Sequence, residues 1–566
     1  MTRQCWTYGV EVDPTEVRAV SAATGLTEVA AAILLRRGLA TSETAARFLQ
    51  PRLSELSDPY LLPDMAAAVR RIFEAVDRGE RIVLFGDYDV DGVTSVAQLQ
   101  RALARYGASV ECFVPLRVEE GYGLSGQGVA RCLELYSPQL IITVDCGTTS
   151  VEPIRALKER GIDVIVLDHH ECPDELPDCV AIVNPKRGEE FHYLCTAGLA
   201  FKLVHALMKE RRLEDFAIRQ LLDLTAFGTV ADLVPLRGEN RTFVYHGLKA
   251  AGMSVWPGVR AFAKLAGSAD GLVARDVSFR IAPRLNAAGR IGDARYALEI
   301  LLSDDPARVE ELMRLLDDQN VQRQSFGVVV KDELEGMFSS SGLDASGVRS
   351  VVAGSESWHP GVVGIAASHL VKMFRRPSFV VSFDSTGYGK GSGRSVPGFP
   401  LVELLRECAE ALVTFGGHDA AAGIGVRRER FEDFRRLFEA AVSRRAQGGD
   451  CVEEIAVEQC LEMGQLGLTL CDDIGRLGPF GMGNEAPLFS LEGVRIERTV
   501  PRGERHLRLD LAQGSRRCSA IWFDGAGVPL PSGLVDVAFE LQRNEYNGRV
   551  EAQLRVVSVR ASEATV

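Results

Sequence analysis

The chain has 566 residues, of which 46% are hydrophobic and 25% charged, and its net charge at pH 7 is −13. These values fit a globular protein of roughly three or four domains. They count against a basic, nucleic-acid-binding surface spread over the whole molecule. The twelve cysteines show no Cys-x-x-Cys spacing, which argues against a zinc ribbon or disulfide scaffold and predicts a cytoplasmic protein. With no long apolar run and no signal-peptide core, we expect no membrane contact.

The first 254 residues predict a helical region followed by an α/β domain. Residues 1–60 are expected to be mostly helical. From 61 to 254, short apolar strands alternate with amphipathic helices. The expected strands are 82–85, 110–114, 140–144 and 164–167, and the expected helices are 65–79, 94–106, 128–135 and 151–160. This alternation is typical of a parallel sheet covered by helices on both faces.

The rest of the chain predicts three further units. Residues 255–345 are rich in helix, and 306–332 fit one long connector helix. A second α/β domain is expected at 346–446, with a strand at 350–353, a helix at 364–374 and a strand at 378–382. In 447–566, apolar and polar residues alternate along 489–499, 506–512, 518–523, 535–542 and 550–559. That pattern predicts a small all-β barrel.

Acidic side chains follow three of the expected strands in the first α/β domain. They are Asp87, Asp89 and Asp91 after the first strand, Asp145 after the third, and Asp168-His169-His170 after the fourth; Asp232 follows a helical segment at 221–229. One such Asp is usually a turn or helix cap. However, the carboxyl ends of neighbouring parallel strands meet at one edge of a sheet. We therefore expect five carboxylates and one or two imidazoles to converge.

This set of donors predicts a site for hard divalent cations. Carboxylates favour such ions, and one or two imidazoles shift the preference from Mg²⁺ toward Mn²⁺. The donors exceed the needs of one ion, so we expect two ions, an arrangement typical of phosphodiester hydrolysis by activated water. The alternative for the first cluster is a solvated acidic turn.

These motifs resemble the DHH phosphoesterase superfamily, named for the sequence seen here as Asp168-His169-His170. Residues 86–92, Asp145 and Asp232 are similar to its other metal motifs, and residues 416–423 resemble the signature of the DHH-associated domain. Within the superfamily, the RecJ exonucleases are most similar, through residues 117–124, 283–290, 358–364, 390–395 and 479–484. The resemblance implies a DHH domain, a DHH-associated domain and an OB-fold. It also implies 5′-to-3′ degradation of single-stranded DNA to mononucleotides, dependent on Mn²⁺ or Mg²⁺, in DNA repair and recombination.

The resemblance also assigns roles to individual residues. The implied metal ligands are Asp87, Asp89, Asp91, Asp145, His169 and Asp232, with Asp87 either a ligand or close to one. The implied catalytic group is Asp87, Asp89, Asp91, Asp145, His169 and His170. His170 contacts the scissile phosphate, transfers a proton or only supports a ligand. Asp168 has an alternative role as the cap that aims the two histidines.

Glycine-rich stretches in the second α/β domain predict a phosphate site. We expect turns whose backbone N–H groups bind anions, with an arginine that can form two hydrogen bonds to phosphate. The expected binding residues for a 5′-phosphate are Arg117, Ser392, Arg394, Ser395, Gly416, Gly417 and His418. The alternatives are plain glycine turns and surface salt bridges.

Arginines and aromatic residues of the C-terminal domain offer the charge and stacking that single strands need. They are Arg502, Arg505, Arg508, Arg516, Arg517, Arg543, Arg549, Trp522, Phe523 and Tyr546. From this group and the preceding helices, we expect Arg290, Arg508 and Tyr546 to contact DNA. The alternative is a solvated charged face.

Two other functions compete with a single-strand exonuclease. One is a phosphoesterase of short oligoribonucleotides, cyclic dinucleotides or pyrophosphate, which would need neither the β domain nor the N-terminal region. The other is a non-catalytic DNA-binding scaffold, which is disfavoured because every expected ligand is present. The resemblance further implies a monomer that works with a single-strand-binding protein and a RecQ-like helicase.

Overall fold

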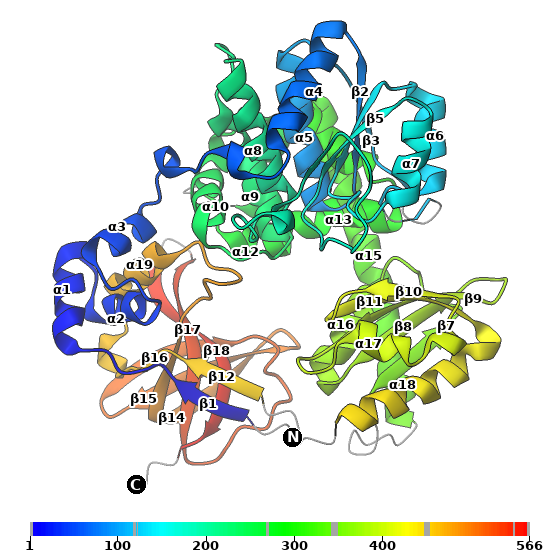
Figure 1. Ribbon diagram of the computed structural model, residues 1–566. Helices are drawn as coiled ribbons and strands as arrows, with labels where there is room; N and C mark the ends of the chain where they lie inside the picture. The colour runs from blue at the N-terminus through cyan, green and yellow to red at the C-terminus, as the bar shows by residue number, and fades with distance from the viewer. Residues whose placement is uncertain are drawn as a thin grey trace.

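The computed structural model describes residues 4–116, 120–121, 123–267, 271–340, 349–446, 453–546 and 549–562. Within these ranges, strands form a parallel sheet, a mixed sheet, a closed barrel and one separate two-stranded pair (Figure 1). The predicted fold class is confirmed: a parallel-sheet domain is joined by helices to a second α/β domain, and an all-β OB-fold-like domain follows.

The first α/β unit, built around core residues 62–316, contains the parallel sheet. Its strands run in the order β3-β2-β4-β5-β6 and are β2 (Arg81–Gly86), β3 (Ser109–Phe113), β4 (Leu140–Val144), β5 (Asp163–Leu167) and β6 (Ala181–Val183). The helices are α4 (Met65–Arg78), α5 (Val90–Arg105), α6 (Gly126–Tyr136), α7 (Val151–Glu159), α8 (Thr196–Glu210), α9 (Leu222–Ala231) and α10 (Gly238–Ala250). Ile82 and Leu84 of β2 enter one hydrophobic core, and Val83 and Phe85 enter the other. The sheet is therefore buried on both faces, as its apolar strands predicted.

A helical segment links the two α/β units. It comprises α11 (Pro257–Ala266), α12 (Ala274–Asp276), α13 (Ala282–Ile291), α14 (Arg295–Leu302) and α15 (Pro306–Ser340). Val309 and Leu312 of α15 belong to the core of the first unit, whereas Val330 and Leu334 pack with residues of the second. One continuous helix therefore takes part in both cores, and it extends past the predicted end at residue 332.

The second α/β unit, residues 349–446, has a mixed sheet in the order β10-β11-β9-β8-β7. Its strands are β7 (Val351–Ser355), β8 (Ser378–Phe383), β9 (Tyr388–Arg394), β10 (Thr414–Gly417) and β11 (Ala421–Arg427), and its helices are α16 (Val363–Phe374), α17 (Leu401–Arg406) and α18 (Phe431–Arg445). The prediction of glycine turns at 391–395 and 416–417 was wrong, because these residues lie in or directly after β9 and β10. A Cβ on Gly393 would lie 2.3 Å from the Phe379 ring, and one on Gly391 would lie 2.6 Å from Ile424 Cγ1. The glycines let the strand approach bulky core side chains.

The C-terminal barrel closes through pairing of β14 with β17. Its elements are β13 (Gln459–Cys460), α19 (Leu468–Leu477), β14 (Leu488–Arg502), β15 (His506–Gln513), β16 (Arg516–Trp522), β17 (Leu534–Tyr546) and β18 (Arg549–Ala561). The N-terminal helices α1 (Pro14–Thr24), α2 (Glu28–Arg36) and α3 (Ser42–Leu49) share a hydrophobic core with it. Strand β1 (Gln4–Tyr8), which was not expected, pairs in parallel with β12 (Glu453–Val457). The two ends of the chain therefore form one body (Figure 1).

Within the described residues, no single helix has both the length and the apolar character to cross a bilayer; α1 and α2 meet that test only as a pair, with a 110° bend between them.

Asp223 is a buried carboxyl group in α9, the helix that ends beside Asp232. Burial raises the pKa of Asp223 to about 6, against the lowering effect of hydrogen bonds from Ser254 and Leu224 and of the Arg101 charge. An unfolded chain releases this proton near pH 4. The folded state therefore holds more protons between about pH 4 and 6, so the free energy of unfolding falls as the pH rises through that window.

We expect Asp223→Asn to become more stable relative to wild type as the pH rises from 4 to 6, because the asparagine cannot ionise. The relative gain should reach roughly 3 kcal/mol at pH 7. Urea denaturation of both proteins across this range measures it. A difference that stays constant with pH would contradict the assignment.

Candidate metal centre and phosphate pocket

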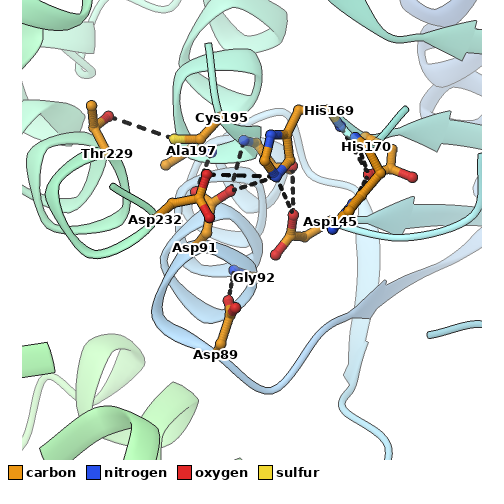
Figure 2. A network of polar contacts seen from close by, with 12 residues as sticks. Asp89, Asp91, Gly92, Asp145, His169, His170, Cys195, Ala197, Thr229 and Asp232 are labelled. Atoms are coloured by element: carbon orange, nitrogen blue, oxygen red, sulfur yellow. Dashed lines mark hydrogen bonds and ion pairs between the residues drawn. The ribbon is translucent and has the colours of Figure 1, made fainter. Parts of the chain in front are cut away.

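The acidic residues lie at the carboxyl edge of the parallel sheet, as predicted (Figure 2). Asp87 and Asp89 follow β2, and Asp89 caps α5 by accepting a hydrogen bond of 3.1 Å from the Gly92 N–H. Asp91 lies in the first turn of α5, Asp145 follows β4, and the two histidines follow β5. Because β2, β4 and β5 are neighbours, their ends bring these residues together.

His169 lies among three carboxylates that come from three different segments. Its Nε2 is 3.4 Å from Asp145 Oδ1, 3.6 Å from Asp232 Oδ2 and 3.9 Å from Asp91 Oδ2. Asp145 is also grouped with Asp87 and Asp89, each with a ligand atom within 4.8 Å of the others. The structure therefore brings all six predicted metal ligands to one place, with Asp145 shared between two groups.

The N-terminus of α8 anchors two of these carboxylates. The backbone N–H groups of Thr196 and Ala197 each donate to Asp91 at 2.8 Å, and Thr196 Oγ1 donates to Asp145 Oδ1 at 2.8 Å. A helix N-terminus favours negative charge. Thr196 was missed from the sequence because nothing in its local pattern marks it. Asp145 has a backbone φ of 65°, an uncommon conformation for a residue other than glycine.

The carboxylates of this cluster are buried close together, an arrangement that a bound cation would stabilise. Burial and the neighbouring carboxylates raise the pKa of Asp145 well above its usual range and that of Asp232 to about 9. Asp232 Oδ2 is buried and accepts no hydrogen bond from any residue that the structure describes. A divalent cation would neutralise such a cluster and use that oxygen, so the donors fit a metal. Cys195 lies beside Asp91 and Asp232, but burial raises the pKa of its thiol, which leaves it a poor ligand.

Asp168 aims the two histidines, which supports its interpretation as a cap. Its Oδ1 accepts hydrogen bonds from the N–H groups of His169 (2.8 Å) and His170 (3.2 Å) and lies 2.7 Å from His170 Nδ1. Its Oδ2 accepts from the Thr148 N–H at 3.0 Å. Burial acts to raise the pKa of Asp168, but the hydrogen bonds with His170 and Thr148 outweigh it and hold this pKa well below its usual range.

We expect Asp168→Asn to lower metal-dependent turnover by about 10–100-fold, as is typical when a group that orients a metal ligand is changed. DNA affinity should not change. Steady-state rates and fluorescence anisotropy measure the two effects. Asp174→Asn, in the exposed loop that follows, is the matched control. Wild-type turnover of the Asp168 variant would contradict this role.

A cavity of about 420 Å³ lies between α13 of the linking helical segment and the second α/β unit. Its lining includes Arg290 of α13, Lys390, Ser392 and Arg394 of β9, and Gly417 of β10. Arg394 Nη1 donates to Ser392 Oγ at 3.0 Å. Three residues at every second position of one strand thus face the same space. Lys390 was missed from the sequence, although it follows the same alternation.

Ser395, Gly416 and His418, which were also predicted to bind phosphate, are next to lining residues in the sequence but are not among the described residues that line this cavity. Ser395 Oγ donates to the Phe399 carbonyl at 2.6 Å, and the His418 N–H donates to Ala421 at 2.8 Å. Arg117 lies outside the described residues.

Acidic neighbours pair with several of the barrel arginines. Arg508 is 3.0 Å from Asp510, Arg517 is 2.7 Å from Glu497, and Arg543 is 2.8 Å from Asp472. The barrel is therefore less basic than a count of its arginines predicts. The side chain of Tyr546 lies outside the described residues.

Family models match three parts of the chain: the "DHH family, N-terminal domain" at residues 81–229, the "DHHA1 domain" at 347–444 and the "RecJ OB domain" at 457–558. The single-stranded-DNA-specific exonuclease RecJ of Bacillus subtilis is 36% identical over 561 residues, covering 97% of this chain and 70% of that protein. RecJ of Thermus thermophilus is 37% identical over 517 residues, covering 91% and 74%. A crystal structure of T. thermophilus RecJ in complex with Mn²⁺ matches with a TM-score of 0.85 and 33% identity, covering 99% of this chain and 80% of that one. The resemblance drawn from the motifs is confirmed, and the chain belongs to the RecJ family of DHH phosphoesterases.

Proposed function

We propose that this protein is a metal-dependent exonuclease of single-stranded DNA. The observation that carries the proposal is the convergence of His169 with Asp91, Asp145 and Asp232 at distances of 3.4–3.9 Å. The curated relatives named single-stranded-DNA-specific exonuclease RecJ support the choice of substrate. No observation favours the alternative of a phosphoesterase for short oligoribonucleotides or cyclic dinucleotides.

The proposed ligands are Asp87, Asp89, Asp91, Asp145, His169 and Asp232, and they would hold two Mn²⁺ or Mg²⁺ ions. When bound, such ions activate water and neutralise charge on the phosphate. The Thr196 hydroxyl and the α8 N-terminus fix Asp145 and Asp91 against their mutual repulsion. The ligand set is therefore held in place by hydrogen bonds that the protein itself supplies.

His170 is proposed to contact the scissile phosphate as a charged donor. Burial opposes its protonation, but the hydrogen bond with Asp168 outweighs this effect and raises the pKa of His170 to about 9. At neutral pH, the ring is therefore charged and directs Nδ1–H toward Asp168. We propose that Nε2–H donates to a phosphate oxygen or to the leaving group.

The cavity between α13 and the second α/β unit is proposed to bind the 5′-terminal phosphate. Arg290, Lys390, Ser392 and Arg394 supply cations and a hydroxyl, which together suit a phosphate dianion. Anchoring the end of the strand in this cavity supports 5′-to-3′ release of mononucleotides from the metal centre. Arg117, Ser395, Gly416, Gly417 and His418 remain proposed contacts, as do Arg508 and Tyr546 along the barrel.

We also propose a division into residues 1–60, 61–254, 255–345, 346–446 and 447–566. We further propose that the protein is a monomer and works in the cytoplasm on intermediates of DNA repair and recombination. Its proposed partners are a single-strand-binding protein and a RecQ-like helicase.

The test uses one oligonucleotide labelled at its 5′ end or its 3′ end, as a single strand and as a duplex, with Mn²⁺ or with EDTA. We expect immediate release of labelled mononucleotide from the 5′-labelled single strand, slow shortening of the 3′-labelled strand, and no activity with EDTA. Dinucleotides are included as a competing substrate. Exclusive turnover of dinucleotides, or full activity after the divalent ions are removed, would overturn the proposal.

A further inference from the structure

A loop of the barrel reaches the segment that carries a metal ligand. This loop, Pro479-Phe-Gly-Met-Gly-Asn484, connects α19 to β14 and extends toward the helices of the first α/β unit (Figure 1). We call it the 479–484 loop. It matched the family motifs in the sequence, yet it contributes nothing to the metal centre or the phosphate cavity directly.

The 479–484 loop contacts the residues just after Asp232. The Leu236 N–H donates a hydrogen bond of 2.7 Å to the Met482 carbonyl. A Cβ on Gly481 would lie 2.7 Å from Leu236 Cδ1, and one on Gly483 would lie 3.2 Å from Pro235 Cβ. Gly483 also has a φ of 70°, which favours glycine. The loop therefore packs closely against Pro235 and Leu236, and at Gly483 the backbone conformation itself requires glycine.

Hydrogen bonds hold the loop in one shape. Asn484, which is 3% exposed, donates from Nδ2 to the carbonyls of Leu477 (3.1 Å) and Pro479 (2.7 Å) and accepts from Arg37. The backbones of Gly481 and Asn484 exchange two hydrogen bonds, of 3.0 and 3.1 Å. Arg241 of α10 donates to the Gly478 carbonyl at 2.7 Å. The loop is thus a fixed surface, anchored to the barrel and to the first α/β unit.

The segment that the loop contacts needs such support. Asp232 ends α9, and Leu233, which is 64% exposed, has a φ of 58°. Between Asp232 and α10, the Leu233 N–H donates to the Val230 carbonyl at 3.4 Å, and Asn240 Nδ2 donates to the Pro235 carbonyl at 3.1 Å. The Met482 contact, at 2.7 Å, is the shortest of these hydrogen bonds. Leu236 itself is buried in the core of the first unit. Because Pro235 and Leu236 follow Asp232 closely in the chain, we expect a displacement of either residue to shift the carboxylate of Asp232 relative to His169.

We propose that the 479–484 loop is a positioning element for Asp232, so that the metal affinity of the first α/β unit depends on the docked barrel. Gly481, Gly483 and Asn484 are positioning residues and touch neither substrate nor reacting atoms. The inference rests on the proposed function, in which Asp232 is a metal ligand.

The test measures Mn²⁺ binding to the full chain by isothermal titration calorimetry, without DNA. Gly483→Ala should weaken Mn²⁺ binding by about 10–100-fold, the range seen when a group that orients a ligand is lost. Gly514→Ala is the matched control: Gly514 also lies in the barrel, has a φ of 60° and has nothing within 4 Å of the added Cβ. Its backbone strain is similar, so its Mn²⁺ affinity should equal that of wild type. Single-strand affinity, measured by anisotropy in EDTA, should be equal in all three proteins.

Gly481→Ala is the second variant, because its added methyl meets only the Leu236 side chain and folding is retained more easily. It should weaken Mn²⁺ binding in the same direction. Mn²⁺ affinities within twofold of wild type in both loop variants would overturn this inference but would leave the proposed function intact. An equal loss in Gly514→Ala would also overturn it, since strain anywhere in the barrel would then suffice. Failure of wild type to bind Mn²⁺ would instead overturn the proposed function.

Discussion

Replacing Asp145 should abolish cleavage while leaving the binding of single-stranded DNA intact. Asp145 belongs to both groups of candidate ligands, and its Oδ1 lies 3.4 Å from His169 Nε2. Removing it takes away a ligand shared by the two groups, so the loss should exceed the cost of changing a supporting group and reach at least about 10³-fold. Rates on a labelled single strand with Mn²⁺, together with anisotropy in EDTA, measure both effects.

Two variants separate charge from backbone conformation at this position. Asp145→Asn retains a residue that tolerates a φ of 65°, whereas Asp145→Ala does not. Both should be inactive, and the Asn variant should keep the wild-type melting temperature. Asp215→Ala, on the exposed loop after α8, is the control for an unrelated carboxylate. Turnover by Asp145→Asn near the wild-type rate would remove Asp145 from the metal centre.

Replacing Arg394 by Ala should slow the cleavage of strands with a 5′-phosphate much more than the cleavage of strands with a 5′-hydroxyl. A charge-assisted hydrogen bond is worth about 1.5–3 kcal/mol, which predicts a fall of roughly 10–150-fold in kcat/KM on 5′-phosphorylated strands. Strands with a 5′-hydroxyl lack the phosphate dianion and should lose little. The measurement is kcat/KM on both substrates with the same sequence.

The control for Arg394 is Arg435→Ala, an arginine of the same unit that lies on the surface of α18. It should affect neither substrate. If Arg394→Ala reduces cleavage of both strands equally, the cavity does not recognise the terminal phosphate. A preserved preference for phosphorylated ends would point to Lys390 or Arg290 as its source instead.

The elements that the sequence predicted are those with strong local patterns. The strands around residues 82–85, 140–144 and 164–167 are continuous apolar runs, and each ends in an acidic residue at a sheet edge. Strands that form through long-range pairing have no such local pattern in the sequence. Strand β1 forms because residues 4–8 meet residues 453–457, and β6 has only three residues. Both are stabilised by partners that a local window does not contain.

The glycine-rich strands and the supporting residues of the site were missed for a related reason. Gly391 and Gly393 read as turn residues, but the side chains that require them, Ile424 and Phe379, come from neighbouring strands. Thr196 holds Asp91 and Asp145 across about 50 to 105 residues of sequence. Ligands are marked by their residue type, whereas the groups that hold them are defined by the fold.

Helix α15 sets the geometry between the proposed phosphate cavity and the proposed metal centre. One end is buried with the first α/β unit and the other with the second, so the helix acts as a rigid strut between them. Deleting one residue from its middle would turn the second unit by about 100° and draw it closer by about 1.5 Å. The proposed phosphate site would then face away from the proposed metal centre. The length of α15 therefore sets the distance from the proposed phosphate site to the proposed metal centre, and with it the size of the product that such a pair of sites would release, although no described residue of this helix is among the candidate ligands or the cavity lining.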